Sequence, residues 1–242
     1  MANDKVYIHE FINITKQNRA RYVHHIAANW SPIGQRQRHQ LCYGVWGVVG
    51  STGEWPQVVN LWEEDGFAGL AESFRTELNN SSLQDPALAK WWAAAADLRS
   101  GGLDRLLVPH PDTLTIEALC GAGVSGEAYA HEIVSVRPGA NHEFLDKTLT
   151  QADKVRDRFG WHLTGAWWTA MRNDDECVLL WAIPSWEAWS ELEQALVVEP
   201  DALSADLAMI EDRRRILLVD APLSPMRIGR QPAVTDRTDW ED

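Results

Sequence analysis

The string Tyr7-Ile8-His9-Glu10 recurs in the second half of the chain as Tyr129-Ala130-His131-Glu132. Each copy opens a run of β-branched and aromatic residues, which is typical of a β-strand. Because one opening strand recurs in each half of a chain of 242 residues, the sequence predicts an internal duplication.

Each half follows the order strand, helix, two strands, helix, strand. The helices are indicated by apolar residues at a spacing of 3.6, such as Tyr22, Ile26 and Trp30, and the strands by short β-rich runs. This βαββαβ order is that of the ferredoxin-like unit. We expect strands at residues 5–14, 41–49, 56–63, 103–108, 129–136, 163–170, 177–183 and 216–219.

Short strings also agree between the halves at corresponding places. They are Gly44-Val45-Trp46 with Gly165-Ala166-Trp167, Leu61-Trp62 with Leu180-Trp181, and Arg105-Leu106-Leu107-Val108 with Arg215-Ile216-Leu217-Leu218. Two such units with one sheet each can bury their second sheet faces against one another. The predicted fold is therefore α+β: two tandem ferredoxin-like repeats packed as an α+β barrel, with helices outside and a cavity between the sheets.

The expected boundaries are a first repeat at residues 1–110, a linker at 111–127, a second repeat at 128–225 and a disordered polar tail at 226–242. The linker contains Gly121-Ala122-Gly123-Val124-Ser125-Gly126, which has the form G-x-G-x-x-G. A dinucleotide site needs this pattern after a strand and at the start of a helix. Here it precedes a strand, so we interpret it as a flexible connection.

Several loose motifs occur in one order along both halves. They are the strand-opening Tyr7 and Tyr129, the turn Arg137-Pro138-Gly139, Trp30-Ser31-Pro32-Ile33, Gly44-Val45-Trp46, Val59-Asn60-Leu61-Trp62-Glu63, Asp85-Pro86 with Trp91-Trp92, and Leu106-Leu107-Val108-Pro109. Over about residues 5–110 and 128–225, this order resembles the NIPSNAP family of the dimeric α+β barrel superfamily.

The resemblance implies an α+β barrel but selects no activity. Family members commonly carry Glu-Leu-Arg after the tyrosine of the strand, whereas this chain has Ile-His-Glu and Ala-His-Glu. The roles of the family's acid and arginine therefore do not transfer to these positions. The superfamily fold hosts monooxygenases, isomerases, cyclases, haem enzymes and non-catalytic binders, so fold alone does not identify the function.

Composition excludes several classes of function. The net charge of −13 argues against nucleic acids and anionic membranes as partners, and we interpret the basic cluster Arg213-Arg214-Arg215 as a helix end that meets a strand. No apolar run approaches the ~20 residues of a membrane span, and the N-terminus lacks the apolar segment of a signal peptide. Cys42, Cys120 and Cys177 form no C-x-x-C, which indicates reduced thiols in a cytoplasmic protein.

A carboxylate interrupts an apolar face in each opening strand. Strand alternation places Glu10 and Glu132 among apolar residues and places His9 and His131 on the opposite face. Burial alone can raise the pKa of a carboxyl by up to about 3–5 units, so each Glu is a candidate catalytic acid or base. The structural alternative is a hydrogen bond to Tyr, Trp or Arg that the duplication has kept in both halves.

The opposite face carries His9 and His131 together with Tyr7 and Tyr129. These side chains could face the space between the sheets, where the histidines could approach each other and polarise a substrate, but the sequence does not decide which face of the strand points inward. The structural alternative is a pair of satisfied interior histidines. Two histidines without an inward carboxylate make an incomplete metal site, and neither H-E-x-x-H nor C-x-x-C occurs, so no metal is predicted.

Haem is the alternative cofactor, since related barrels hold haem through one histidine. The sequence selects no ligand among the remaining candidates, His24, His25, His142 and His162. The leading prediction is therefore a protein without a cofactor.

The two central hairpins carry Tyr43, Trp46, Trp62, Trp167 and Trp181. Any that point between the sheets would line an aromatic substrate pocket, whereas any that face the helices would be core. Periodicity cannot separate the two groups, because both faces of each sheet are covered.

The leading hypothesis is a barrel that binds an apolar or aromatic small molecule and acts as a cofactor-independent acid/base enzyme of isomerase, cyclase or dehydratase type. One alternative is a haem-dependent enzyme of the same fold. The other is a non-catalytic binding or interaction protein, for which we expect a closed and filled space between the sheets. A homo-oligomer is compatible with each hypothesis.

Overall fold

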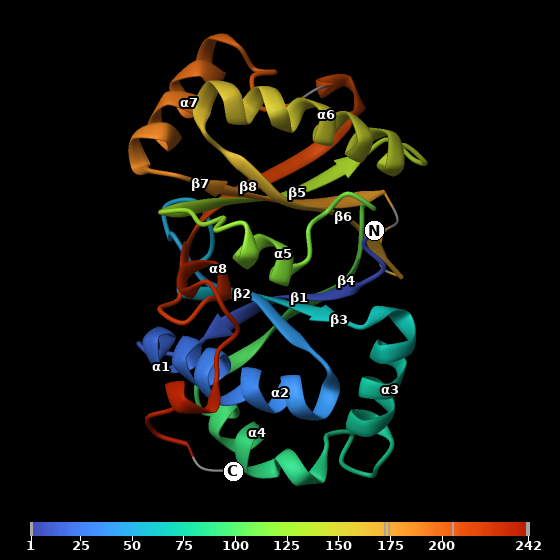
Figure 1. The fold of residues 1–242 in the computed structure, drawn as a ribbon, viewed down its shortest axis with the longest axis vertical. Coiled ribbons are helices and arrows are strands. Elements are labelled where there is room, and N and C mark those ends of the chain that lie inside the picture. Colours follow the sequence, from blue (N-terminus) through green and yellow to red (C-terminus); the bar gives the residue numbers. More distant parts are fainter. Residues whose placement is uncertain (1, 172, 174, 205, 241–242) are drawn as a thin grey trace.

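The computed structural model describes residues 2–171, 173, 175–204 and 206–240. The βαββαβ order occurs twice, with short additional helices (Figure 1). The strands are β1 (Val6–Ile14), β2 (Leu41–Val48), β3 (Gln57–Glu64), β4 (Arg99–Pro109), β5 (Ala128–Val136), β6 (His162–Ala170), β7 (Glu176–Ile183) and β8 (Ile210–Asp220). The helices are α1 (Arg19–His24), the π-helix η1 (His25–Trp30), α2 (Ser31–Arg38), α3 (Gly66–Leu78), η2 (Pro86–Leu88), α4 (Ala89–Ala96), α5 (Ile116–Gly121), α6 (Asn141–Phe159), α7 (Trp186–Val198), η3 (Leu207–Met209), α8 (Pro225–Ile228) and η4 (Val234–Asp236).

The eight strands close into one barrel in the order β1-β3-β2-β8-β5-β7-β6-β4. Each repeat contributes four neighbouring strands, and the repeats meet at two short antiparallel seams. One seam joins β2 to β8 over residues 46–48 and 218–220, and the other joins β4 to β6 over residues 106–109 and 167–170. The predicted α+β barrel of two ferredoxin-like repeats is confirmed.

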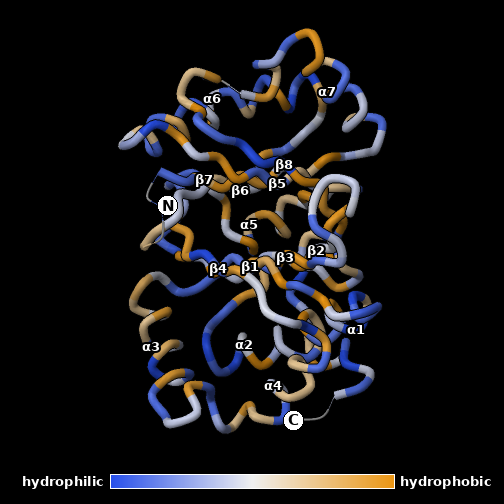
Figure 2. The backbone as a smooth tube through the Cα atoms, turned by 180° about the vertical axis from the view of Figure 1, so that it is seen from behind, coloured by the Kyte–Doolittle hydropathy of each residue, from blue (hydrophilic) through white to orange (hydrophobic). Residues whose placement is uncertain are grey.

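The helices cover the two outer faces of the barrel. In Figure 1, α6 and α7 lie over the sheet of the second repeat, and α1 to α4 lie beyond the sheet of the first. Figure 2 shows the hydrophobic colours gathered along the strands between these layers. The short helices α5 and α8 lie between the sheets, where Ile116, Leu119 and Met226 are buried among interior side chains. The connection between the repeats and the segment after β8 therefore both contribute side chains to the barrel interior.

The repeated Gly-x-Trp string has a steric cause. The register of each strand shifts next to the glycine, between Cys42 and Gly44 in β2 and between Leu163 and Gly165 in β6. A Cβ atom added to Gly44 would lie 2.0 Å from the ring of Trp46, and one added to Gly165 would lie 1.8 Å from that of Trp167. Glycine is required because each indole lies directly over the backbone.

Strand β8 is longer than predicted. It begins at Ile210, so Arg213, Arg214 and Arg215 lie within a strand and not at a helix end. Charged residues are accommodated there because they have partners: Arg213 forms an ion pair with Glu132, and Arg215 donates to Glu193 Oε2 over 2.8 Å.

The two last strands also align differently from the sequence strings. Arg105 lies opposite His9 in the first repeat, whereas Ile216 lies opposite His131 in the second. Arg105 therefore corresponds to Ile216 and not to Arg215, because strand pairing fixes the register.

The polar C-terminal segment, predicted as disordered, instead packs against the first repeat as far as residue 240. Gln35 Nε2 donates to Pro232 O over 2.8 Å, and Arg237 Nη2 donates to Asn29 O over 3.1 Å. The last two residues of that predicted tail lie outside the described part of the chain.

Candidate functional site

The face of β1 and β5 that carries histidine looks into the barrel. The Nε2 atoms of His9 and His131 are 2.8 Å apart, so one ring donates and the other accepts. Phe11 packs edge-on against both rings. Burial is the main cause of a lowered pKa at both histidines, and the nearby charge of Arg105 adds to it; together such effects lower the pKa of His131 to about 3. The two rings therefore meet, which the sequence had left open, whereas a catalytic role for either stays a prediction.

Aromatic rings fill the space between the sheets. Tyr7, Tyr43 and Trp167 meet with ring centroids 5.4 to 5.7 Å apart, and Trp46 packs on Tyr129 at 5.8 Å. All five side chains are fully buried. These predicted substrate-binding residues thus contact one another. A filled space between the sheets is what we expect if the protein is a non-catalytic binding or interaction protein.

Glu132 lies on the opposite face of β5, beneath the helices of the second repeat. Its carboxylate accepts from Trp181 Nε1 over 2.7 Å and forms an ion pair with Arg213. Both of its oxygens are therefore engaged in a fully buried environment. This arrangement is the one expected of a structural carboxylate.

Glu10 occupies the same place in the first repeat but has different neighbours. Its Oε2 atom accepts from Trp62 Nε1 over 2.8 Å and from Asn60 Nδ2 over 2.9 Å. Among the described residues, no cation forms an ion pair with Glu10 and no donor bonds Oε1. Burial, reinforced by the charge of Asp104, raises the pKa of this carboxyl against the opposing effect of its two donors and Arg99.

Strand register explains the difference between the two glutamates. Glu10 lies opposite Asp104 on β4, whereas Glu132 lies opposite Arg215 on β8. Two residues earlier on the same outer face, β4 has Gly102 where β8 has the ion-pairing Arg213. The first repeat therefore lacks a counterpart of Arg213, the cation that pairs with the carboxylate in the second.

Glu10 borders a cavity of about 140 Å³ between the first sheet and its helices. We call this cavity the Glu10 pocket. Its walls are Ile8, Glu10, Ile26, Trp30, Arg38, Gln40, Trp62, Ser73, Phe74, Glu77, Trp91, Trp92 and Arg99. Trp30 and Trp91 are in ring contact at 4.7 Å, and Trp91 and Trp92 at 4.9 Å. The pocket thus combines an aromatic wall with a half-buried carboxylate whose pKa is raised.

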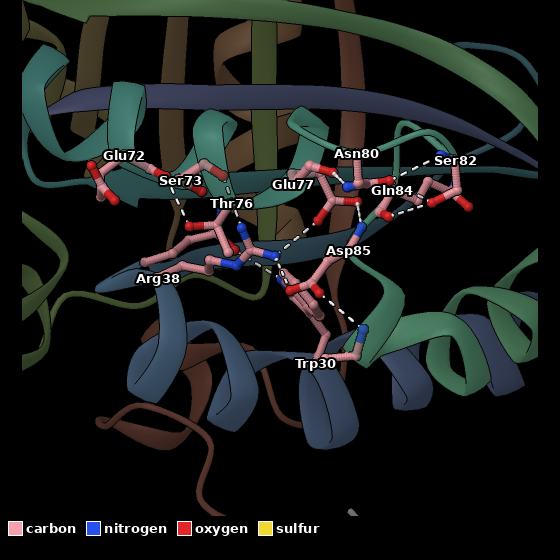
Figure 3. Close-up of polar contacts among 12 residues, drawn as sticks. Trp30, Arg38, Glu72, Ser73, Thr76, Glu77, Asn80, Ser82, Gln84 and Asp85 are labelled. Carbon is pink, nitrogen blue, oxygen red and sulfur yellow. Dashed lines mark hydrogen bonds and ion pairs between the residues drawn. The ribbon is translucent and has the colours of Figure 1, made fainter.

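A buried network around Arg38 fixes the helices that form the pocket (Figure 3). Arg38 Nη1 donates to Ser73 O over 2.8 Å, and Nη2 donates to Glu77 over 2.9 Å and to Asp85 over 2.8 Å. Asp85 also accepts from Ala87 N over 2.9 Å at the start of η2, which leads into α4. One guanidinium therefore links α2, α3 and the helical turn before Trp91.

A second chain of bonds runs behind the pocket. Trp30 Nε1 donates to Gln40 Oε1 over 2.8 Å, and Gln40 Nε2 donates to Glu64 Oε1 over 2.6 Å. Burial raises the pKa of Glu64 to about 7. Trp30 is therefore held in position by its indole nitrogen.

The sequence identified only part of this pocket. Glu10 and Trp62 were both candidates, although Trp62 and its counterpart Trp181 lie on the outer sheet faces. Trp30, Trp91 and Trp92 were not predicted as site residues. The available signal was the Asp85-Pro86 helix start, which places the tandem tryptophans over the first sheet.

Among the described residues, no group of three or more His, Cys, Asp or Glu side chains could hold a metal ion. No helix within those residues combines the length and the apolar character that crossing a membrane requires.

No protein-family model and no curated protein sequence matches the chain. Its fold is similar to a putative monooxygenase from Lactobacillus acidophilus (TM-score 0.56, 10% identity, 90% of this chain and 94% of that one). It is also similar to an anthrone oxidase-like protein (TM-score 0.57, 8% identity, 91% and 93%) and to the putative chlorite dismutase TA0507 (TM-score 0.55, 10% identity, 92% and 98%). These similarities place the chain in the dimeric α+β barrel fold.

A NIPSNAP domain protein from Burkholderia xenovorans covers 39% of the chain at 16% identity, with a TM-score of 0.33. A TM-score this low does not establish a shared fold, so membership of the NIPSNAP family remains a prediction.

Proposed function

We propose that the protein binds a small apolar or aromatic molecule in the Glu10 pocket and exchanges a proton with it through Glu10. The observation that supports this most directly is the contrast between the duplicated glutamates. Glu132 is neutralised by Arg213, whereas Glu10 keeps one oxygen without a donor among the described residues and borders a cavity. A general base needs such a free oxygen and a pKa nearer neutrality.

The size of the pocket limits the ligand. A cavity of roughly 150 Å³ lined by apolar side chains accommodates one benzene molecule. The Glu10 pocket, at about 140 Å³, therefore fits a single ring in contact with Trp62 and Trp91.

Glu10 and Arg99 can share one proton-transfer reaction. Glu10 would take a proton from a carbon next to a carbonyl group, and the electron pair would move to the carbonyl oxygen. Arg99, also in the pocket wall, supplies positive charge for the developing anion. Where a carbon–carbon double bond adjoins that carbon, the anion is a dienolate, and return of the proton from Glu10 to its far end shifts the double bond. This completes an isomerisation with atoms and charge balanced and no external oxidant.

The test uses a ring ketone as a probe of base catalysis. Cyclohexanone is incubated with the protein in D₂O, and exchange of its α-hydrogens is followed by proton NMR. We expect the wild type to accelerate exchange and Glu10→Gln to lose that acceleration by about 10²-fold or more, the usual contribution of a positioned base. Glu132→Gln, studied where circular dichroism shows it folded, should retain the acceleration.

Binding is measured separately through the indole N–H signals of Trp62, Trp91 and Trp92. Shifts of these signals in both the wild type and Glu10→Gln would show that the ring occupies the pocket independently of catalysis. Binding without accelerated exchange would favour the non-catalytic alternative. Unchanged exchange in Glu10→Gln would contradict the assignment of the base.

Haem does not fit the barrel interior or the Glu10 pocket. The histidines inside the barrel bond each other beneath Phe11, and no histidine lines the Glu10 pocket. The haem-dependent alternative would gain support from a Soret band after haem is added to the purified protein.

A further inference from the structure

The chain makes the same turn after β4 and after β8. His110 N donates to Ala166 O over 2.9 Å, and Ala221 N donates to Val45 O over 2.9 Å. Three residues later a hydroxyl accepts from the same strand residue: Ala166 N donates to Thr113 Oγ1 over 3.2 Å, as Val45 N donates to Ser224 Oγ over 3.3 Å. The edge of β6 next to Ala166 and the edge of β2 next to Val45 are therefore equivalent.

In the first repeat, a glutamine side chain completes this edge. Cys42 N donates to Gln231 Oε1 over 2.9 Å, and Gln231 Nε2 donates to Cys42 O over 2.8 Å. The planar carboxamide thus pairs with both main-chain groups of one residue, as a neighbouring strand would. Cys42 is fully buried.

In the second repeat, the equivalent place is open. Leu163 lies opposite Trp181 just before the register shift in β6, as Cys42 lies opposite Trp62 before that in β2. Within the described part of the chain, no side chain is hydrogen-bonded to the Leu163 main chain. The connection after β4 turns into α5 and enters β5, so it supplies no counterpart of Gln231.

A cavity of about 340 Å³ borders Leu163. Leu114 of the connection and Leu149 and Ala152 of α6 give it an apolar wall. Asp112, with its side chain 79% exposed, and Arg156, at 49%, also line it and reach solvent. The cavity is therefore apolar on one side, charged toward solvent, and bordered by a strand residue whose equivalent binds a carboxamide.

We infer that this cavity binds a ligand that carries a primary carboxamide on an apolar body. The carboxamide would take the place that Gln231 takes in the first repeat, donating to Leu163 O and accepting from Leu163 N. The apolar body would contact Leu149 and Ala152. This site lies on the opposite repeat from the Glu10 pocket and is independent of the function proposed for that pocket.

The experiment observes the Leu163 amide directly, in the full chain labelled with [¹⁵N]leucine and assigned through Leu163→Ile. Benzamide is titrated alongside N,N-dimethylbenzamide and benzoate, which have the same ring but lack the N–H donors. We expect benzamide to shift the Leu163 signal saturably and to bind at least about tenfold more tightly than either analogue, since each analogue leaves a main-chain acceptor unpaired. Ala152→Trp should abolish binding by filling the cavity.

Two sources of the carboxamide can be separated. The peptide acetyl-Arg-Gln-Pro-dimethylamide copies residues 230–232, and its glutamine carries its only primary carboxamide. Tighter binding of this peptide than of benzamide would indicate a glutamine of a partner protein, and the reverse order would indicate a free small molecule. Equal affinity for benzamide and its two analogues, or an unshifted Leu163 amide with both benzamide and the peptide, would overturn the inference.

Discussion

The buried histidine pair predicts how stability changes below neutral pH. We consider His9→Gln and His131→Gln, which each remove one imidazole from the barrel interior. Both histidines are buried, at 1% and 3% exposure, and share a single hydrogen bond, so the folded state holds both rings neutral. Burial and nearby arginines lower the pKa of each, so below neutral pH these histidines bind protons in the unfolded chain but not in the folded chain.

The magnitude follows from linkage. An unfolded histidine with a pKa of about 6.5 becomes almost fully protonated as pH falls from 7 to 5, which costs the folded state about 2 kcal/mol per histidine. The sign is that of a lowered pKa for a base: stability is complete above the unfolded pKa and falls as pH decreases. We therefore expect the wild type to lose about 2 kcal/mol more than either single variant, and about 4 kcal/mol more than the double variant.

The assay is urea denaturation followed by tryptophan fluorescence at pH 8, 7, 6 and 5. The difference between wild type and variant isolates the histidines, because buried carboxyls such as Glu64 contribute to both curves. The curves should run parallel between pH 8 and pH 7, where the histidines are neutral in both states. Parallel curves between pH 7 and pH 5 would refute the reasoning.

Three further predictions concern stability. Glu132→Gln should lower the free energy of unfolding by about 3 kcal/mol, because it leaves the partly buried Arg213 without its carboxylate partner. Glu10→Gln should change the free energy of unfolding by less than about 1 kcal/mol. Equal losses of stability in urea denaturation would contradict this contrast. Gly165→Ala should cost about 2–4 kcal/mol, because its Cβ would overlap the Trp167 ring, while Gly121→Ala, with open space around it, should leave the melting temperature nearly unchanged. Glu64→Gln should stabilise the protein by about 3 kcal/mol at pH 8 and hardly at pH 4. The pKa of Glu64 is about 4.5 in the unfolded chain and about 7 in the folded protein, so its ionisation costs stability as pH rises through this range. A gain in stability that does not depend on pH would contradict this prediction.

The sequence predicted the fold because the duplicated Tyr-x-His-Glu string and the order of apolar runs were present twice. It separated each histidine from its neighbouring glutamate, since strand alternation alone does so. It could not decide which face pointed inward, because helices cover the outside of both sheets as fully as aromatic rings fill the inside.

The difference between Glu10 and Glu132 was also hidden in the sequence. Matching Arg105 with Arg215 made the two last strands look alike, whereas hydrogen bonding places Asp104 opposite Glu10 and Arg215 opposite Glu132. A slip of one residue thus reversed the charge beside the candidate base. The Glu10 pocket also depends on Arg38, Asp85 and Trp91, which come together only when three helices pack on the sheet.

The closure of both sheets within one chain has a consequence for how such a barrel can change. When two identical subunits form a barrel, every substitution appears twice, so a change that opens a pocket on one sheet also opens it on the other. Here the seams between β2 and β8 and between β4 and β6 join halves that are encoded separately. One half can therefore keep an ion pair that stabilises the protein while the other gives it up, and the barrel need not bear the cost of that loss twice.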